Sequence, residues 1–341
     1  MTIDRRDFLK NAGTVGTLAV GAAVSEQAEA QTTPAAQAKR PRGMAKGLTL
    51  LTMRVGGVDR LGVKTERGIL NVAQAATILK MYAPATLDDL LQNEDGPAME
   101  ALVKASLASN AVQAAFTQES TIEYGPLVGR PEKIVCVGLN YANHAKEVGQ
   151  PIPKFPVLFN KFNTTLNRHK GTIKLPTDLA TQFDYEVELV IVMGRTASRV
   201  READALSYVA GYATGNDFTA RDLQNNRGGQ WMLGKTVDQF APIGPYLVTA
   251  DQVDPDKLAI ELRVNGVTRQ RSNTADFIAN SRRMISYISE YIVLKPGDLI
   301  FTGTPEGVIQ GMQKDKQVWL KPGDKIACSL EKLGELTFDL V

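Results

Sequence analysis

The segment from Asp184 to Met193, Asp-Tyr-Glu-Val-Glu-Leu-Val-Ile-Val-Met, constrains the fold most strongly, because it is an apolar run that begins with two glutamates. Residues two apart on a β-strand point the same way, so Glu186 and Glu188 are predicted to share one face. Two such carboxylates repel each other and are costly to remove from water. A hard divalent cation removes this cost, so Mg²⁺ or Mn²⁺ is the expected cofactor, with Ca²⁺ as a further candidate. A solvated strand face is the alternative interpretation.

A second polar cluster lies between residues 211 and 222, among small and aromatic residues. Asp217 is predicted to supply a third oxygen ligand to the same cation. Arg221 and Gln224 follow at helical spacing, and they are predicted to meet an anionic substrate, because a guanidinium pairs with a carboxylate through two hydrogen bonds. The alternative for Asp217 is that it caps a short helix that starts near Thr219.

A histidine and a glutamate follow the apolar segment 133–138. His144 and Glu147 are three residues apart, so their side chains touch on a helical turn. An imidazole held by a carboxylate is a general base, because the acid fixes the tautomer and stabilises the imidazolium. The alternative is an incidental pair on a surface helix. The other histidine, His169, lies in a polar loop and is assigned no role.

Residues 229–236 match the phosphate-loop pattern G-x4-G-K-[ST]. The match is rejected because no strand precedes it, Trp231 makes the loop bulky, and Pro242 prevents a following helix. Lys235 is retained as a cation near the acidic cluster.

The rest of the chain is rich in predicted strands. Residues 47–70 look like a small hairpin array, and residues 258–271 form a hairpin that turns at Asn265-Gly266. Further strands are predicted over 133–138, 156–161, 184–193, 243–249, 298–302 and 325–341, and helices over 98–116 and 274–291. The strands do not alternate regularly with helices, which argues against a Rossmann or TIM architecture and predicts a strand-dominated α+β fold.

Composition limits the classes of partner. The 341 residues are 43% hydrophobic and carry a net charge of +2 without a basic stripe, so no nucleic-acid partner is expected. Cys136 and Cys328 lie in apolar runs and are predicted to be buried thiols, with a disulfide left open. Two histidines are too few for a zinc site rich in His and Cys.

The N-terminus resembles a twin-arginine signal peptide over residues 1–30. Arg5 and Arg6 precede an uncharged stretch that is too short and too rich in glycine for a stable membrane span. Cleavage is expected after Ala30, with residues 31–46 as a linker, and the mature protein is expected in the periplasm. A disordered tail is the alternative.

Taken together, residues ~130–341 resemble the fumarylacetoacetate hydrolase superfamily. The motifs that carry the resemblance are Val137-Gly138-Leu139-Asn140-Tyr141 with His144 and Glu147, Asp184-Tyr185-Glu186-Val187-Glu188-Leu189, Asn216-Asp217-Phe218-Thr219-Ala220-Arg221-Asp222, Trp231-Met232-Leu233-Gly234-Lys235, and Phe301-Thr302-Gly303-Thr304-Pro305-Glu306-Gly307-Val308. The resemblance implies a mixed β-sandwich roll that forms a homodimer, with residues 47–125 as a small N-terminal domain and 130–341 as the catalytic domain.

The resemblance also implies roles for individual residues. Glu186, Glu188 and Asp217 would hold the metal, and His144 with Glu147 would activate water. The remaining residues implied at the site are catalytic Lys235 and substrate-binding Tyr141, Arg221, Gln224, Gly303 and Thr304. The chain departs from many relatives at Asn143, where they carry Asp, and in residues 309–316, where they have a second glycine directly after Val308.

The expected activity is metal-dependent hydrolysis of a C–C bond in a small β-diketo acid, such as an acylpyruvate. An isomerase or decarboxylase of a 2-oxo or 2-hydroxy-dienoic dicarboxylic acid is the first alternative, because the same site can enolise a substrate without adding water. A periplasmic binding protein that holds a metal-chelating acid without turnover is the second.

Overall fold

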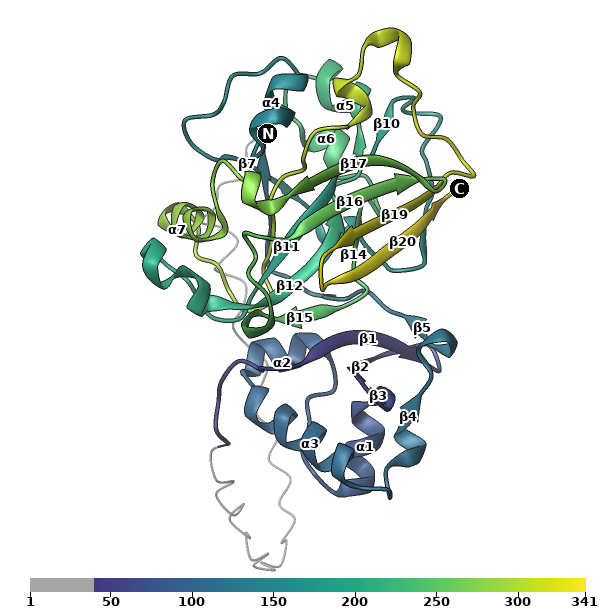
Figure 1. Cartoon of the computed structure of the whole chain (residues 1–341), viewed down its shortest axis with the longest axis vertical. Helices are drawn as coiled ribbons and strands as arrows, with labels where there is room; N and C mark the ends of the chain where they lie inside the picture. Colours follow the sequence, from purple (N-terminus) through teal and green to yellow (C-terminus); the bar gives the residue numbers. More distant parts are fainter. Residues whose placement is uncertain (1–39) are drawn as a thin grey trace, which may run out of the picture. The chain divides into compact units, whose positions relative to one another are not determined.

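The computed structural model describes residues 40–341 (Figure 1). The segment predicted as a signal peptide and residues 31–39 of the predicted linker lie outside the described residues. The first described residues contact the rest of the described chain. Gly43, for example, donates its backbone N–H to Glu94 and accepts one from Gly96.

The largest sheet has 13 strands. In chain order these are β1 (Thr49–Val55), β2 (Val58–Thr65), β3 (Gly68–Asn71), β4 (Phe116–Thr117), β5 (Glu123–Tyr124), β6 (Ile134–Gly138), β7 (Val157–Lys161), β8 (Leu166–Arg168), β11 (Val187–Met193), β12 (Val209–Asn216), β14 (Ala241–Ile243), β15 (Leu247–Thr249) and β18 (Leu299–Phe301). Its main path runs β4-β3-β2-β1-β15-β12-β11-β18-β6-β7. The predicted hairpin array is thus one end of this sheet, joined to the rest where β1 pairs with β15.

A second sheet has five strands in the order β17-β16-β19-β20-β9. They are β9 (Gly171–Ile173), β16 (Ala259–Val264), β17 (Val267–Asn273), β19 (Lys325–Leu330) and β20 (Gly334–Leu340). Two further strands, β10 (Phe183–Asp184) and β13 (Thr219–Ala220), pair with each other. The helices are α1 (Val72–Leu79), α2 (Leu87–Asn93), α3 (Gly96–Ala108), α4 (Ala142–Glu147), α5 (Arg221–Asn226), α6 (Met232–Lys235) and α7 (Ser281–Tyr291). The predicted strand-dominated α+β fold is confirmed.

Strand β11 lies at the centre of the large sheet and is buried along its whole length. Val187, Leu189 and Ile191 face a core shared with the five-stranded sheet, while Val190 and Val192 face a second core shared with β1 and the helices α1 to α3. Burial on both faces explains why the segment reads as an unbroken apolar run.

Several predicted elements differ from the observed ones. The strand over 184–193 is interrupted before Val187, and the N–H of Tyr185 is taken by the Asp184 side chain. The strand over 243–249 is divided at Gly244-Pro245, where the proline offers no N–H to a ladder. Helix α7 begins after Asn280, whose side chain accepts the Arg283 N–H, and α3 ends at Ala108. The hairpin at Asn265-Gly266 is confirmed.

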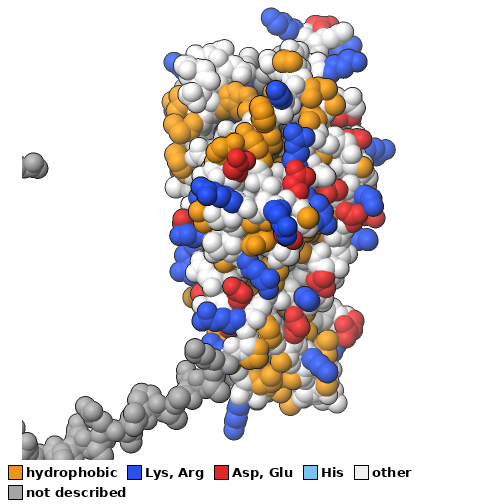
Figure 2. Space-filling model, turned by 90° about the vertical axis from the view of Figure 1, so that its left-hand side faces the viewer, with side chains coloured by type: hydrophobic (Ala, Val, Ile, Leu, Met, Phe, Trp, Pro, Cys, Tyr) orange, Lys and Arg blue, Asp and Glu red, His pale blue; other side chains and the backbone are white. Residues whose placement is uncertain are grey.

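The surface mixes charges of both signs. On the face drawn in Figure 2, basic and acidic side chains are interspersed, with apolar patches between them. Exposed aromatic side chains include Phe155, which stacks on Tyr287, and Tyr291, which is 66% exposed. Within residues 40–341, no helix has the length and apolar character needed to cross a bilayer.

Candidate metal and substrate site

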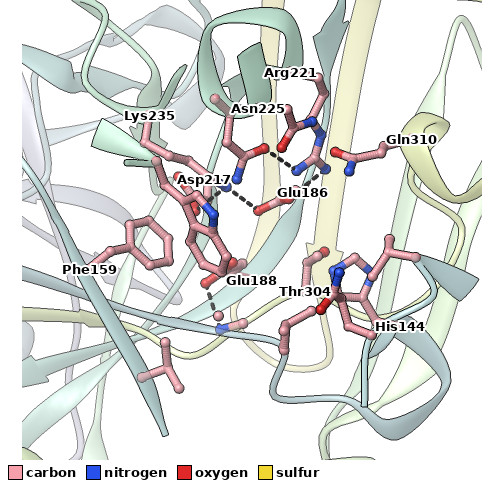
Figure 3. A pocket seen from close by; sticks show the side chains of 18 residues that line it. His144, Phe159, Glu186, Glu188, Asp217, Arg221, Asn225, Lys235, Thr304 and Gln310 are labelled. Atoms are coloured by element: carbon pink, nitrogen blue, oxygen red, sulfur yellow. Dashed lines mark hydrogen bonds and ion pairs between the residues drawn. The ribbon is translucent and has the colours of Figure 1, made fainter. Parts of the chain in front are cut away.

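Three buried carboxylates meet at one end of the β11–β12 pair (Figure 3). Glu186 precedes β11, Glu188 lies in β11, and Asp217 follows β12. The antiparallel register brings them together, and the Asp217 N–H donates to the Glu186 carbonyl at 2.9 Å. One carboxylate oxygen from each residue lies within 4.8 Å of the others. All three side chains are buried, so the interpretation of a solvated strand face is wrong.

Two lysines neutralise part of this negative charge. Lys235, on α6, donates to Glu186 Oε2 and to Asp217 Oδ2, both at 2.7 Å. Lys161, the last residue of β7, lies 2.5 Å from the other Asp217 oxygen. Asp217 therefore does not cap α5, whose N-cap residue Ala220 makes no side-chain cap bond.

An arginine at the start of α5 joins the same cluster. Arg221 Nε donates to Asp184 Oδ2 at 2.8 Å, and its Nη2 lies 2.6 Å from Glu186 Oε1. Its Nη1 donates to Gln224 Oε1 at 3.0 Å. Arg221 and Gln224 therefore lie together, as helical spacing predicts, and both side chains are buried.

The carboxylates differ in how well they are compensated. Burial alone would raise the pKa of Glu186, but the charges of Lys235 and Arg221 outweigh it and lower that pKa to about 2. Burial raises the pKa of Glu188 well above its usual value, and the charges of Asp217 and Glu186 raise it further. The charge of Lys235 favours the ionised form of Glu188, and so does the Gly303 N–H, which donates to Glu188 at 2.8 Å.

The donor set fits a hard divalent cation. Four buried carboxylates, those of Asp184 and of the three-residue cluster, face three basic groups on Lys161, Lys235 and Arg221, so one negative charge remains uncompensated. A dication would bring this buried cluster to one positive charge. Such a site binds oxygen ligands and then attracts an anionic acid. These residues therefore have the chemistry and spacing to hold a divalent metal.

A histidine and its carboxylate partner lie beside the cluster. His144 Nδ1 lies 2.9 Å from Glu147 Oε1, on the helical turn α4 that follows β6. Glu147 is fixed in turn by the Gly307 N–H, which lies 2.9 Å from Oε2. With Nδ1 held in this way, Nε2 is the ring nitrogen left for proton transfer.

These groups surround one cavity of about 260 Å³. It is lined by Val137, Gly138, Leu139, His144, Val148, Gln150, Phe159, Glu186, Glu188, Asp217, Arg221, Gln224, Asn225, Trp231, Lys235, Gly303, Thr304 and Gln310. Nine of the eleven residues predicted for the site are among them. Glu147 lies behind His144, and Tyr141 does not line the cavity. The Tyr141 ring packs edge-on against Phe277 with centroids 5.0 Å apart, and its buried hydroxyl meets no hydrogen-bond partner within residues 40–341.

Sequence reasoning gave no role to several residues at the site. Lys161 stands at the end of an ordinary strand pattern, and only the tertiary fold brings it to Asp217. Trp231 closes one wall beside Phe159, and a Cβ on Gly138 would lie 2.5 Å from the indole, so glycine makes room for this wall. Gln310 lies in the segment 309–316, which was noted as a whole in the sequence without a role for Gln310.

Comparison with known proteins places this geometry in a family. The model for the fumarylacetoacetate (FAA) hydrolase C-terminal domain matches residues 133–341. The mitochondrial oxaloacetate tautomerase Fahd2a of Rattus norvegicus is 36% identical over 298 residues, which are 87% of this chain and 92% of that protein.

Solved structures agree with the match. The 5-carboxymethyl-2-hydroxymuconate delta-isomerase from Mycobacterium smegmatis is 30% identical with a TM-score of 0.64, covering 86% of this chain and 98% of that one. The fumarylpyruvate hydrolase from Pseudomonas aeruginosa, solved with Mn²⁺ and pyruvate, is 36% identical with a TM-score of 0.56, covering 61% of this chain and 89% of that one. Sequence motifs, fold and relatives thus agree, and the chain belongs to the fumarylacetoacetate hydrolase family.

Proposed function

We propose that the protein enolises a small 2-oxo acid with a divalent cation and a histidine base, and that its reaction is the interconversion of the keto and enol forms of a 2-oxo dicarboxylate. The observation that carries this proposal is the His144 imidazole, fixed by Glu147, in the same cavity as three buried carboxylates. The relative named an oxaloacetate tautomerase supports the choice of reaction.

Mg²⁺ or Mn²⁺, with Ca²⁺ as a further candidate, would be held by Glu186, Glu188 and Asp217, and would bind the carboxylate and 2-oxo oxygens and acidify the neighbouring carbon. His144 exchanges a proton with that carbon. In the enol-to-keto direction the imidazolium donates its proton to carbon, while the enol oxygen loses its proton to solvent. Glu147 stabilises the imidazolium between these steps.

The positive groups keep the acid oriented. Lys235 holds Glu186 and Asp217 in place and stabilises negative charge that develops on the substrate oxygen. Arg221 and Gln224, with the backbone around Gly303 and Thr304, contact the rest of the acid.

Hydrolysis of a C–C bond in a β-diketo acid is the second candidate. The His144–Glu147 pair is equally suited to take a proton from water, and the relative named a fumarylpyruvate hydrolase supports this reaction. Decarboxylation would start from the same enolised acid.

One experiment separates these reactions. The protein is loaded with Mn²⁺ and incubated with oxaloacetate or an acylpyruvate. The absorbance of the enol is followed over time, and the masses of the products are determined by mass spectrometry. Tautomerisation leaves the substrate mass unchanged, hydrolysis gives two acids that together contain one added water, and decarboxylation loses carbon dioxide. If Mn²⁺ binds but neither acid reacts faster than with His144→Gln, the proposal fails in favour of a non-catalytic binding protein.

We also propose that the protein is exported to the periplasm by the twin-arginine route and forms a homodimer. The support for export is the order of Arg5-Arg6, an uncharged stretch and a small-residue site ending at Ala30. Cell fractionation of the wild type and of an Arg5→Lys, Arg6→Lys variant tests export, and light scattering of the purified protein tests the dimer.

A further inference from the structure

Gln310 presents its side chain to the cavity. It lies in the short helical turn Ile309–Gly311 that follows β18, and it lines the cavity together with Arg221 and His144. Its Oε1 atom is buried, and among the described residues 40–341 it has no hydrogen-bond partner. Figure 3 shows the carboxamide beside the Arg221 guanidinium, on the side of the cavity away from Phe159. Oε1 is an acceptor and an ionised carboxylate has no proton to donate to it, so Gln310 would meet an anionic ligand through its Nε2 donors.

A single buried carboxylate fixes Gln310 relative to Arg221. Asp184 Oδ2 accepts both the Gln310 backbone N–H, at 3.1 Å, and Arg221 Nε, at 2.8 Å. The other Asp184 oxygen accepts the Ile309 N–H at 2.9 Å. The loop is also held by Gln317, whose Nε2 donates to the Gln310 carbonyl at 3.0 Å. The two side chains therefore reach the cavity from one rigid support.

Arg221 also has donor capacity left for a ligand. Its Nη2 pairs with Glu186 Oε1 at 2.6 Å, and a guanidinium carries five N–H donors, more than Asp184, Gln224 and Glu186 take up. Asp184 and Glu186 already balance its charge. A carboxamide beside it adds two N–H donors without adding charge, and together these groups match the two oxygens of a carboxylate.

We propose that Gln310 and Arg221 bind the second carboxylate of the substrate, and that Gln310 makes the site selective for acids with a carboxylate at both ends. This rests on the proposed function only in that the three-carboxylate cluster is taken to receive the 2-oxo acid end. Phe159 lies on the side of the cavity away from Gln310 (Figure 3), and Trp231 packs edge-on against it, so the distal carboxylate is expected beside Gln310 and Arg221.

Binding of two unreactive acids tests the proposal without turnover. (S)-Malate and (S)-lactate share a 2-hydroxy acid group and differ in the distal carboxylate. Their dissociation constants are measured by calorimetry on the Mn²⁺-loaded protein for the wild type, Gln310→Leu and Gln310→Glu. Gln313→Leu is the matched control, because Gln313 lies on the same loop, is exposed and does not line the cavity.

The wild type is expected to bind malate more tightly than lactate. Gln310→Leu should weaken malate binding about 10- to 100-fold and leave lactate binding unchanged, because a hydrogen bond to a charged group is lost. Gln310→Glu should weaken malate binding further through like charge, and Gln313→Leu should change neither.

Equal effects of Gln310→Leu on both acids, or no effect on either, would overturn the proposal. The Mn²⁺ affinity of each variant, measured first, shows that the cluster is intact. If selective binding of malate depends on Gln310 but no acid turns over, the proposed function fails and this inference stands. If oxaloacetate turns over and KM is the same in Gln310→Leu, the inference fails and the function stands.

Discussion

Lys161 Nζ lies 2.5 Å from Asp217 Oδ1, and both side chains are fully buried. Lys235 contacts the other oxygen of the same carboxylate, so Asp217 is paired with two cations. Within the described residues, no lysine or arginine lies within ion-pair distance of Glu188. Charge compensation in the cluster is therefore uneven, and this has consequences for stability and for metal binding.

Replacement of Lys161 by methionine should destabilise the metal-free protein by about 3–5 kcal/mol, because it leaves a buried carboxylate short of one partner. Added Mn²⁺ should restore more stability to this variant than to the wild type. Urea unfolding with EDTA and with Mn²⁺ measures both effects. Lys133→Met is the control, because Lys133 pairs with buried Asp298 outside the cluster, and Mn²⁺ should not rescue it preferentially. Equal rescue of the two variants would contradict the prediction.

Replacement of Glu188 by glutamine should separate metal binding from stability. Mn²⁺ affinity should fall by about 100-fold or more, because a charged ligand is lost. The metal-free protein should keep or gain stability, since the buried Glu188 charge is opposed by Asp217 and Glu186. Calorimetric Mn²⁺ titration and urea unfolding test the two halves. Unchanged Mn²⁺ affinity would remove Glu188 from the metal site.

Replacement of His144 by glutamine should lower kcat by about 10²–10⁴-fold, the usual contribution of a positioned base. Mn²⁺ affinity should not change, because His144 pairs with Glu147 and not with the three carboxylates. His169→Gln is the matched control and should retain wild-type turnover. A loss of turnover that is explained by a loss of Mn²⁺ would show that His144 acts on the metal site instead.

His169 should make the protein sensitive to acid. Burial, then the neighbouring Lys170, lowers its pKa from 6.5 to about 4, and its Nδ1 accepts the Thr337 N–H at 3.1 Å. The unfolded chain therefore binds a proton below pH 6.5 that the folded protein does not, so stability is lost as pH falls from 6.5 to 4. The loss is on the order of 2 kcal/mol, after allowance for solvent screening. Urea unfolding at pH 7 and pH 5 should show a smaller loss for His169→Gln than for the wild type.

Replacement of Tyr141 by phenylalanine should change kcat/KM by less than about threefold, which corresponds to less than 1 kcal/mol. The resemblance to the family implied that Tyr141 binds substrate, yet its hydroxyl lies buried away from the cavity lining. Steady-state kinetics with oxaloacetate checks this expectation. A larger rise in KM would show that the substrate reaches Tyr141.

Local sequence patterns predicted local features well. The Asn265-Gly266 turn and the strand-dominated class are confirmed, because turn chemistry and side-chain periodicity act over a few residues. The interruption before Val187 could not be predicted, because it depends on where the Asp184 side chain finds its partners in three dimensions.

In the candidate site, too, features set by local sequence could be predicted and features set by tertiary contacts could not. Glu186 and Glu188 drew attention because acidic residues are rare at the start of an apolar strand, and the structure brings Asp217 to them across a strand register. Lys161 and Gln310 could not be selected, because an isolated lysine at a strand end and a glutamine in a loop carry no periodic signal. Their roles arise from contacts between segments more than 50 residues apart.

The pairing of β1 with β15 limits where this chain can be truncated or fused to another protein. The family match starts at residue 133, but Thr49 and Leu50 lie opposite Val248 and Leu247 in the same ladder. A gene fragment trimmed to the matched region would leave one side of β15 with bare backbone donors and acceptors at a new edge. Such an edge recruits other chains, so the trimmed product is expected to precipitate. Any chimera that borrows this catalytic half should therefore carry β1 with it.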